Sequence, residues 1–344
     1  MSETWKNYLH KNGAQLTNNT IIHFRQPEKE YQQVLQTNVI TDLSHFGLIQ
    51  ITGKDAGKFL QGQFTNNVQH VKTEKSQLSA WCNPKGRILV NFRLFKRDDA
   101  YYLFLPQESI ANMLKRLRMF VLRADVKLED VNNHWFGLGI AGIDSVQILT
   151  DCLGCTPPTE IEASLTHNQN TVLRIQGPQP RYLIFTQTPQ TFWECAINTA
   201  RPIGAGAWQL LDILAGIPQI VPATAEEFVP QMVNYQAIGG VSFKKGCYTG
   251  QEIVDRMQYL GTLKRRMYLA KINTTILPQP GDSLYANDNE QSVGKIVNAQ
   301  FHPEGGILVL AVIQIKSAET KDIHWQSQLG ECLKFIDLPY SLEP

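Results

Sequence analysis

The stretch Lys244-Lys245-Gly246-Cys247-Tyr248-Thr249-Gly250-Gln251-Glu252 places one thiol, two cations, a carboxylate and two glycines within nine positions. Neither the period of an amphipathic helix nor that of a strand requires this combination. We therefore expect a loop with a functional role. Gly246 and Gly250 predict a tight turn that other groups approach closely, because glycine adopts backbone conformations that a Cβ forbids.

Cys247 is predicted to be a reactive or ligating thiol. Lys244 and Lys245 favour its thiolate form if they lie near the sulfur, because a neighbouring cation lowers the pKa of a cysteine from about 8.5. Glu252 would be a second charged neighbour. The alternative is that Cys247 is a small packed residue in a turn and that the lysines are merely solvated.

The composition is that of an ordinary globular protein. The chain has 344 residues, which favours two or three domains, and 43% of them are hydrophobic. Because 32 basic residues balance 31 acidic ones, no global field draws the chain to nucleic acid or to an anionic membrane. Met1–Asn18 lacks an apolar run of signal-peptide length, and no later segment is long and apolar enough to span a membrane. We expect a cytoplasmic location.

Cysteine usage gives no disulfide framework. A chain of this size does not need disulfides to hold its core, so reduced thiols are expected. Cys152 and Cys155 have C-x-x-C spacing, but no second such pair or histidine pair completes a zinc site, and we interpret the spacing as coincidence. The six cysteines are Cys82, Cys152, Cys155, Cys195, Cys247 and Cys332.

The first part of the chain predicts a mixed α and β unit. A strand over 48–51 leads to a helix that Asp55 caps and that buries Ala56, Phe59, Leu60 and Phe64 on one face. The amides and the hydroxyl of Gln61–Asn67 would cap the end of this helix. A meander of strands, with a Pro-Gly turn at 83–86, and a helix follow: 78–82, 88–95, 101–105 and 109–122.

The rest of the chain predicts a second α+β unit and a small barrel. An apolar segment at 136–143 and strands at 171–175 and 181–186 indicate the second unit. After Arg266, short β-type segments alternate with turns, which favours a small antiparallel barrel. Its segments are 267–272, 292–297, 307–315 and 332–335.

The motif resembles the signature of the YgfZ family, folate-binding proteins related to the glycine-cleavage T-protein. The resemblance covers nearly the whole chain. It rests on Phe243–Glu252, and also on Phe228-Val229-Pro230-Gln231, Gly239-Gly240-Val241-Ser242, Leu60-Gln61-Gly62-Gln63 with Thr65-Asn66, and Leu338-Pro339-Tyr340.

The resemblance implies an α+β fold in a ring of three domains. Two α+β units, 1–130 and 131–262, would be interleaved and enclose a folate site, and 263–344 would form the antiparallel barrel. It also implies tetrahydrofolate or another reduced folate as cofactor, with no permanent metal. The implied partners are iron-sulfur proteins or their assembly machinery and tRNA-modifying enzymes, without a membrane or strong nucleic-acid binding.

The resemblance also implies site residues. The cofactor-binding residues would be Phe46, Trp208, Asp212, Gln231 and Tyr248. Catalysis would involve Cys247, Lys244 and Glu252, in a loop shaped by Gly246, Gly250, Gln251 and Arg256.

One of these positions, Phe46, and a neighbouring position, Leu214, depart from the family. Phe46 replaces a tryptophan of the better-known bacterial members, which keeps a stacking face and loses an N–H donor. Leu214 stands where related proteins often carry a glutamate that accepts hydrogen bonds from folate. Asp212 can replace that glutamate only if this stretch is extended, because positions two apart then share a face.

A third departure weighs against catalysis. The T-protein aminomethyltransferases carry an Asp pair where this chain reads Arg87-Ile88-Leu89-Val90-Asn91, and no carboxylate is present to steer a proton. Two alternatives to an accessory folate protein are kept. One is a one-carbon (aminomethyl) transferase that uses Asp212 or Glu252, and the other is an RNA-binding protein that acts directly on tRNA.

Overall fold

The computed structural model describes residues 2–287 and 289–342, and these form two compact units. Neither unit is one continuous stretch of chain. Unit 1 comprises Met1–Leu60, Val68–Gln77 and Phe92–Leu211, and unit 2 comprises Gln61–Asn67, Leu78–Asn91 and Asp212–Pro344.

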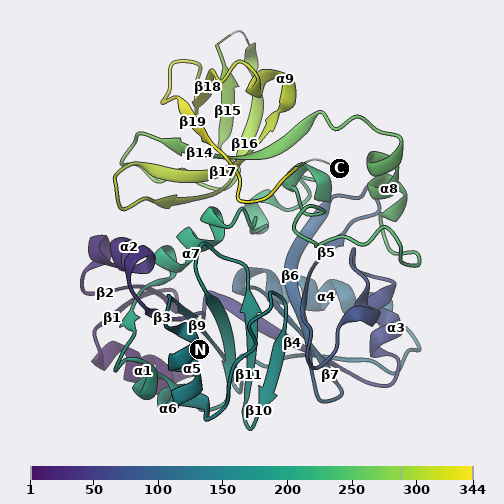
Figure 1. Cartoon of the computed structure of the whole chain (residues 1–344). Coiled ribbons are helices and arrows are strands. Elements are labelled where there is room, and N and C mark those ends of the chain that lie inside the picture. Colours follow the sequence, from purple (N-terminus) through teal and green to yellow (C-terminus); the bar gives the residue numbers. More distant parts are fainter. Residues whose placement is uncertain (1, 288, 343–344) are drawn as a thin grey trace. The chain divides into compact units, whose positions relative to one another are not determined.

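The main sheet of unit 1 has six strands in the order β10-β11-β12-β9-β3-β13 (Figure 1). Its neighbours are antiparallel except β13 and β3, which run parallel. Strand β3 comes from the first 130 residues and the others from later ones, so segments of the two expected α+β units interleave. The strands are β3 (Val39–Asp42), β9 (Phe136–Ala141), β10 (Ser164–His167), β11 (Asn170–Ile175), β12 (Arg181–Thr186) and β13 (Arg201–Pro202).

Three helices cover one face of this sheet (Figure 1): α1 (Glu3–Lys11), α5 (Ser145–Leu153) and α6 (Pro189–Ala196). Because alternate residues of a strand point to opposite faces, Leu138 and Ile140 of β9 share one face. They join Trp5 and Trp193 of the helices in one buried core. The opposite face of β9 therefore carries Gly137, Gly139 and Ala141.

The second large sheet has five strands in the order β5-β6-β7-β4-β8. The predicted meander and the predicted helix after it are confirmed. The strands are β4 (Phe46–Thr52), β5 (Gln77–Cys82), β6 (Ile88–Arg97), β7 (Ala100–Pro106) and β8 (Lys127–Asp130), and the helix is α4 (Ile110–Val121).

The helix after Asp55 is shorter than predicted. It spans α3 (Ala56–Gln61), whereas the apolar spacing predicts that it continues to Phe64. Phe64 instead forms an isolated β-bridge with Trp81, and it is fully buried. Gly62 directly after the helix end is consistent with this early stop, because glycine in a helix interior is unfavourable.

Unit 2 contains a curled antiparallel half-barrel of six strands, in the order β18-β15-β16-β17-β14-β19. The expected antiparallel sheet is thus confirmed, but the sequence patterns miss β15 and β18. The edge strands β18 and β19 meet at an isolated bridge between His324 and Cys332. The strands are β14 (Arg265–Ile272), β15 (Ser283–Ala286), β16 (Asn289–Phe301), β17 (Ile307–Gln314), β18 (Ile323–Trp325) and β19 (Leu333–Ile336).

The remaining elements are short. A two-stranded sheet and four helices complete the described part of the chain, together with single 3-10 turns. They are β1 (Ala14–Thr17), β2 (Thr20–Phe24), α2 (Pro27–Gln36), α7 (Ala205–Leu214), α8 (Gln251–Tyr259) and α9 (Ile315–Ala318). Across the described residues, every helix is too short or too polar to cross a lipid bilayer.

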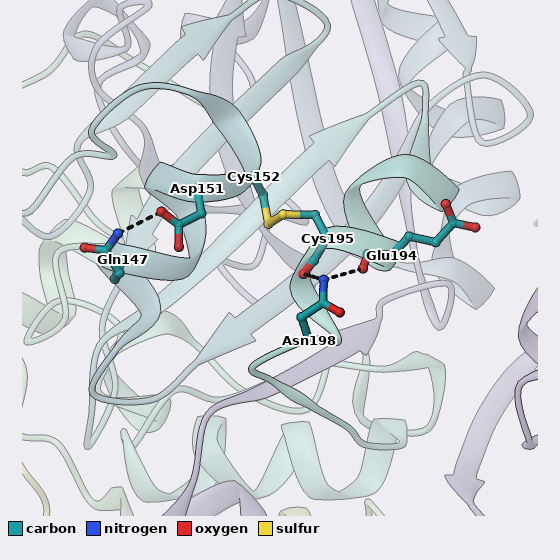
Figure 2. Close-up of a disulfide and its surroundings, with 6 residues drawn as sticks. All are labelled: Gln147, Asp151, Cys152, Glu194, Cys195 and Asn198. Carbon is teal, nitrogen blue, oxygen red and sulfur yellow. Dashed lines mark hydrogen bonds between the residues drawn. A yellow bond between two sulfur atoms is a disulfide. The ribbon is translucent and has the colours of Figure 1, made fainter.

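The expectation that all cysteines are reduced is wrong. Cys152 and Cys195 form a disulfide, with their Cα atoms 5.6 Å apart (Figure 2). The cause is tertiary: α5 and α6 pack on the same face of the sheet and bring the two positions within the range that a disulfide requires. Cys155 keeps a free thiol, so the C-x-x-C spacing does not describe the bond that forms.

Candidate functional site

Most of the motif lies in a loop, as the sequence predicts, but its last two residues, Gln251 and Glu252, begin helix α8, which the sequence analysis does not predict. We name residues 239–250 the Cys247 loop. It contains turns but no helix or strand, and the Cys247 thiol is free and exposed at the surface. A thiol in this position is accessible to a ligand or a partner protein.

Of the two motif glycines, only Gly250 lies where a larger residue would clash with its neighbours. Gly250 has φ +85°, and a Cβ there would lie 2.4 Å from the backbone oxygen of Asn83. Gly86, in the predicted Pro-Gly turn, has φ +69° and packs against Ile253 of α8. At Gly246 a Cβ would meet nothing within 4 Å. The predicted close approach is therefore confirmed at Gly250 and is wrong at Gly246.

Lys245 holds the Cys247 loop in place. Its Nζ donates hydrogen bonds to the backbone oxygens of Gln61, Phe64 and Asn66, at 2.7, 2.5 and 3.1 Å. The same ammonium lies 4.9 Å from the ring centroid of Tyr248, within cation–π range. Burial lowers the pKa of Lys245 from 10.5 to about 8. This lysine is directed into unit 2, where it binds carbonyl oxygens.

The segment Gln61–Asn67 binds the loop with its side chains as well. Thr65 Oγ1 donates to Gly240 O at 2.8 Å, and Asn66 Nδ2 donates to Gly239 O at 2.7 Å. The Ser242 amide in turn donates to Thr65 O at 3.0 Å. The expectation that this amide and hydroxyl cap the preceding helix is wrong: the hydroxyl donates to a residue 175 positions later, and Asn66 Nδ2 also donates to Leu78 O at 2.8 Å.

Tyr248 and Gln231 lie inside unit 2, and three polar atoms near α8 lack a partner. Tyr248 Oη, Gln231 Oε1 and Asp255 Oδ1 are buried and have no hydrogen-bond partner in the part of the chain that the structure describes. Gln231 Nε2 donates to Val254 O at 2.7 Å. Burial raises the pKa of Tyr248 far above its usual range, and Cys82 and Asp255 act in the same direction.

The other predicted loop residues are at the surface or fix the helix start. Lys244, Glu252 and Arg256 are exposed. Gln251 Oε1 accepts a hydrogen bond from the Tyr248 amide at 3.1 Å, and its Nε2 donates to Asp255 at 2.9 Å. A chemical role for Lys244 and Glu252 beside Cys247 stays a prediction.

Phe46 lines a small cavity of about 20 Å³ within unit 1, which we name the aromatic cavity. Its ring stacks on Phe104 at 4.6 Å between centroids. Asn132 adds a polar group: its Oδ1 accepts from the Leu48 amide at 2.7 Å, while its Nδ2 is buried and lacks a partner among the described residues. The lining residues are Asp42, Leu43, Ser44, Phe46, Gly47, Leu48, Phe104, Gln107, Asn132, Trp135, Phe136 and Gly137.

Trp208 lies on the same face of β9 as this cavity. Gly137 and Gly139, two positions apart on β9, point to one face. A Cβ on Gly137 would lie 3.4 Å from Phe104, and one on Gly139 would lie 2.7 Å from Trp208. Trp208 itself is only 1% exposed, and the Arg181 guanidinium carbon lies 4.6 Å from its ring centroid. One side of this indole is thus already occupied by a cation.

The stretch that carries Asp212 is helical. It belongs to α7 (Ala205–Leu214), and residues two apart on a helix do not face each other. Asp212 could replace the carboxylate missing at Leu214 only if this stretch were extended. Because the stretch is helical, that condition is not met. Whether Asp212 contacts a cofactor in another way stays a prediction.

Arg87–Asn91 is occupied by structural contacts within unit 2. Asn91 Nδ2 donates to Pro218 O at 2.7 Å, and Asn91 Oδ1 accepts from the Ile220 amide at 2.8 Å. Arg87 donates to the backbone oxygen of Glu227 at 2.5 Å. The side chains of this segment thus bind the backbone of neighbouring segments of unit 2. At the corresponding position the aminomethyltransferases are expected to carry a catalytic carboxylate.

Three residues at this cavity and its flanking strand are not expected from the sequence: Asn132, Gly137 and Gly139. One signal was present: a glycine inside a strand pattern indicates a close approach of another group, and Gly137-Leu138-Gly139 has two of them. Asn132 has no such signal, because its place in the cavity depends on the pairing of β4 with β8.

Comparison with known proteins defines the class of fold first. Residues 8–163 match the family model described as the GCVT N-terminal domain. The structure superposes on the glycine cleavage system aminomethyltransferase T from Bartonella henselae with a TM-score of 0.77, at 15% identity. The superposition covers 98% of this chain and 96% of that chain, so the two share a fold.

Two curated relatives define the family more closely. The chain is 32% identical to the tRNA-modifying protein YgfZ of Photorhabdus laumondii over 306 residues, and 31% identical to the protein of the same name from Yersinia pseudotuberculosis over 307. Each match covers 88% of this chain and 92% of the relative. The chain belongs to the YgfZ family.

Proposed function

We propose that this chain binds tetrahydrofolate or another reduced folate in the aromatic cavity and acts in the assembly or repair of iron-sulfur proteins. Through those proteins it would affect tRNA modification. The names of the two relatives support the link to tRNA modification. The observation that carries the proposal is the aromatic cavity, with its stacked Phe46 and with Asn132 Nδ2, which has no hydrogen-bond partner among the described residues.

The chemistry of the residues present fits the ring of a folate, but the cavity of about 20 Å³ must widen to admit it, since ligand pockets are roughly 300–1,000 Å³. The pyrimidinone ring of a reduced pterin is flat and bears an amide-type carbonyl oxygen, so it suits an aromatic face next to an N–H donor. Asn132, which lines the cavity, suits this role, because the Leu48 amide holds its Oδ1 and its Nδ2 has no partner among the described residues. When bound, a reduced folate carries one-carbon groups. Phe46 and Asn132 would hold and orient its ring.

Cys247 supports the iron-sulfur part of the proposal. Thiolates are the usual ligands of iron-sulfur clusters, and one cysteine does not hold a cluster alone. Cys247 would therefore share ligation with a partner protein or a small thiol. Its exposure allows that contact, while Lys245 fixes the loop that presents it.

A titration with tetrahydrofolate tests the cofactor. Binding to the whole chain is followed by tryptophan fluorescence, because Trp135 lines the aromatic cavity. We expect saturable quenching that weakens at least tenfold in Phe46→Ala and in Asn132→Ala. The control is Phe120→Ala, an aromatic residue 46% exposed on α4. Equal affinity of all four proteins, or no binding at millimolar folate, would contradict the proposal.

A complementation experiment tests the thiol. Cells that lack their own copy of this protein are given the wild type, Cys247→Ser or the matched control Cys155→Ser, and the activity of a tRNA-modifying iron-sulfur enzyme is measured. We expect Cys247→Ser alone to fail. If it restores activity fully, Cys247 has no role in cluster chemistry, although the folate titration still stands.

The wild type and the same variants distinguish this proposal from its two alternatives, a one-carbon transferase and an RNA-binding protein. Formation of a one-carbon product from tetrahydrofolate and an aminomethyl donor would favour a transferase. Direct tRNA binding that falls steeply between low and physiological salt would favour an RNA-binding protein, because phosphate contacts release counterions.

A further inference from the structure

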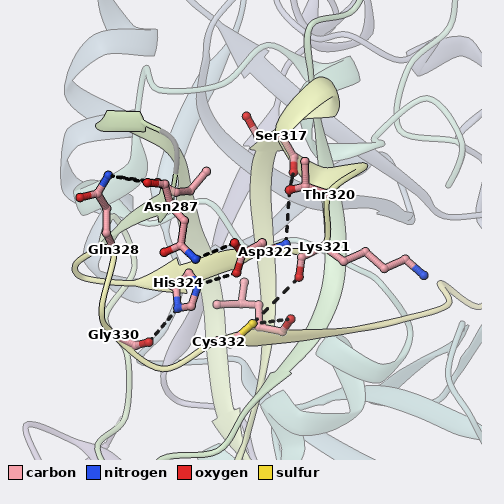
Figure 3. A network of polar contacts seen from close by, with 11 residues as sticks. Asn287, Ser317, Thr320, Lys321, Asp322, His324, Gln328, Gly330 and Cys332 are labelled. Carbon is pink, nitrogen blue, oxygen red and sulfur yellow. Dashed lines mark hydrogen bonds and ion pairs between the residues drawn. The ribbon is translucent and has the colours of Figure 1, made fainter.

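The half-barrel of unit 2 brings together a carboxylate, an imidazole and a thiol where its two edge strands meet (Figure 3). Ile323 and Trp325 are buried, so Asp322 and His324 point to the outer face of the same segment. Cys332 faces His324 across the isolated bridge. The three ligand atoms all lie within 4.8 Å of one another.

Hydrogen bonds orient the first two groups. His324 Nδ1 lies 2.8 Å from Gly330 O, and a carbonyl only accepts, so this nitrogen carries the hydrogen. His324 Nε2 lies 2.8 Å from Asp322 Oδ1. In a neutral ring Nε2 then carries no hydrogen, so His324 Nε2 and Asp322 Oδ1 are both hydrogen-bond acceptors. Two acceptors that lie 2.8 Å apart require a cation between them. A shared proton meets this requirement at 2.8 Å, and a metal ion meets it once the two atoms separate to about 3.3 Å.

A further hydrogen bond fixes the carboxylate. Asp322 Oδ2 accepts from Asn287 Nδ2 at 2.6 Å, which leaves Oδ1 on the side of His324. Metal-binding histidines usually donate their second N–H to a carbonyl or carboxylate, and metal-binding carboxylates are themselves hydrogen-bonded. Gly330 O and the Asn287 amide supply such partners here (Figure 3).

We propose that Asp322, His324 and Cys332 form a binding site for a divalent metal ion of the zinc class. Nitrogen, oxygen and sulfur ligands together suit Zn²⁺, whereas Mg²⁺ and Ca²⁺ prefer oxygen alone. Three protein ligands leave a fourth position for solvent or an outside ligand. The site is separate from the Cys247 loop and from the aromatic cavity, and it does not depend on the proposed function.

Only a small movement is needed to complete the site. Around tetrahedral Zn²⁺ the ligand atoms lie roughly 3.3–3.5 Å apart. Cys332 is exposed, and its Sγ has only long contacts to carbonyl oxygens, at 3.8 and 4.0 Å. Rotation of this side chain toward His324 therefore breaks no strong interaction. The bound ion would link the edge strands β18 and β19.

Metal titration of the full, tag-free chain tests this site. The background protein carries Cys155→Ser and Cys247→Ser, so that Cys332 is its accessible free thiol; the fourth free cysteine, Cys82, is buried. After treatment with a chelator, Zn²⁺ binding is measured calorimetrically, and Co²⁺ is added as a spectroscopic probe of thiolate ligation. We expect one equivalent of Zn²⁺ and a thiolate-to-cobalt absorption band.

Variants of the same background separate ligands from positioning residues. Cys332→Ser is expected to abolish the cobalt band and to weaken Zn²⁺ binding at least 100-fold, and His324→Ala likewise. Asn287→Ala, which removes only the partner of Asp322, is expected to weaken it about 10- to 100-fold and to keep the band. No stoichiometric binding, or binding that Cys332→Ser leaves unchanged, would overturn the proposal and assign the short His324–Asp322 contact to a shared proton.

Discussion

Replacing Lys245 by methionine tests whether the Cys247 loop is held by a half-buried ammonium. Methionine keeps much of the apolar stem and removes the charge. The three carbonyl oxygens of Gln61, Phe64 and Asn66 then lose their donor. Hydrogen bonds to a charged group contribute about 1.5–3 kcal/mol each, so the three together give roughly 4.5–9 kcal/mol.

Burial of the ammonium opposes this gain. The lowering of the Lys245 pKa from 10.5 to about 8 corresponds to about 3.4 kcal/mol, at 1.36 kcal/mol for each pH unit. Subtracting this burial cost from the hydrogen-bond contribution gives the free energy of unfolding that Lys245→Met should lose. It is about 3 kcal/mol, within a range of roughly 1–6 kcal/mol. Urea unfolding measures this loss, and hydrogen exchange at the Ser242 amide, which donates to Thr65 O, reports on the loop itself.

Lys244→Met is the matched control. Lys244 is the neighbouring residue, carries the same charge and is exposed, so its replacement should change stability by less than about 0.5 kcal/mol. If the two variants unfold alike and exchange the Ser242 amide alike, the ammonium does not anchor the loop and the reasoning fails.

Three further perturbations have definite expected results. Burial lowers the pKa of His45 from 6.5 to about 3, so below pH 6.5 the unfolded chain binds a proton that the folded chain does not. The free energy of unfolding should therefore fall by about 2 kcal/mol between pH 7.5 and 5, as measured by urea unfolding at each pH. In His45→Phe this fall should disappear. Gly250→Ala forces an alanine into a left-handed conformation 2.4 Å from a backbone oxygen and should cost at least about 2 kcal/mol, against less than about 0.5 for Gly246→Ala; equal melting temperatures of the two would contradict the geometry. Reducing the bond between Cys152 and Cys195, 43 positions apart, should cost about 4 kcal/mol, and a thermal scan with and without reductant that shows no change would mean that the two thiols are not linked in solution.

Local patterns predict much of the fold. The Pro-Gly turn at 83–86, the helix at 110–121 and the antiparallel strands after Arg266 all follow from nearby residues. The strands β15 and β18 are missed because they have only four and three residues, and the second includes a histidine that faces outward.

The sequence predicts the candidate site less completely, because the interactions of the site are distant in sequence. Spacing predicts a loop around Cys247 and a required glycine at Gly250, and both are observed. The pattern does not show which of Lys244 and Lys245 is directed inward, since the partners of Lys245 lie about 180 residues earlier. The disulfide was missed for a similar reason: only the packing of α5 against α6 brings Cys152 to Cys195.

The bonds between Gln61–Asn67 and the Cys247 loop also constrain how the chain is made in the cell. Thr65 leaves the ribosome 175 residues before its partner Gly240. At about 5–20 residues per second, this gap lasts roughly 10–35 s. During that time the Thr65 hydroxyl is without its native acceptor, Asn66 Nδ2 has only Leu78 O of its two acceptors, and the ends of β5 and β6 that belong to unit 2 lack the rest of that unit. The first half of the newly synthesised protein must therefore stay soluble while incomplete, and a chain that terminates before residue 239 leaves this half permanently unfinished.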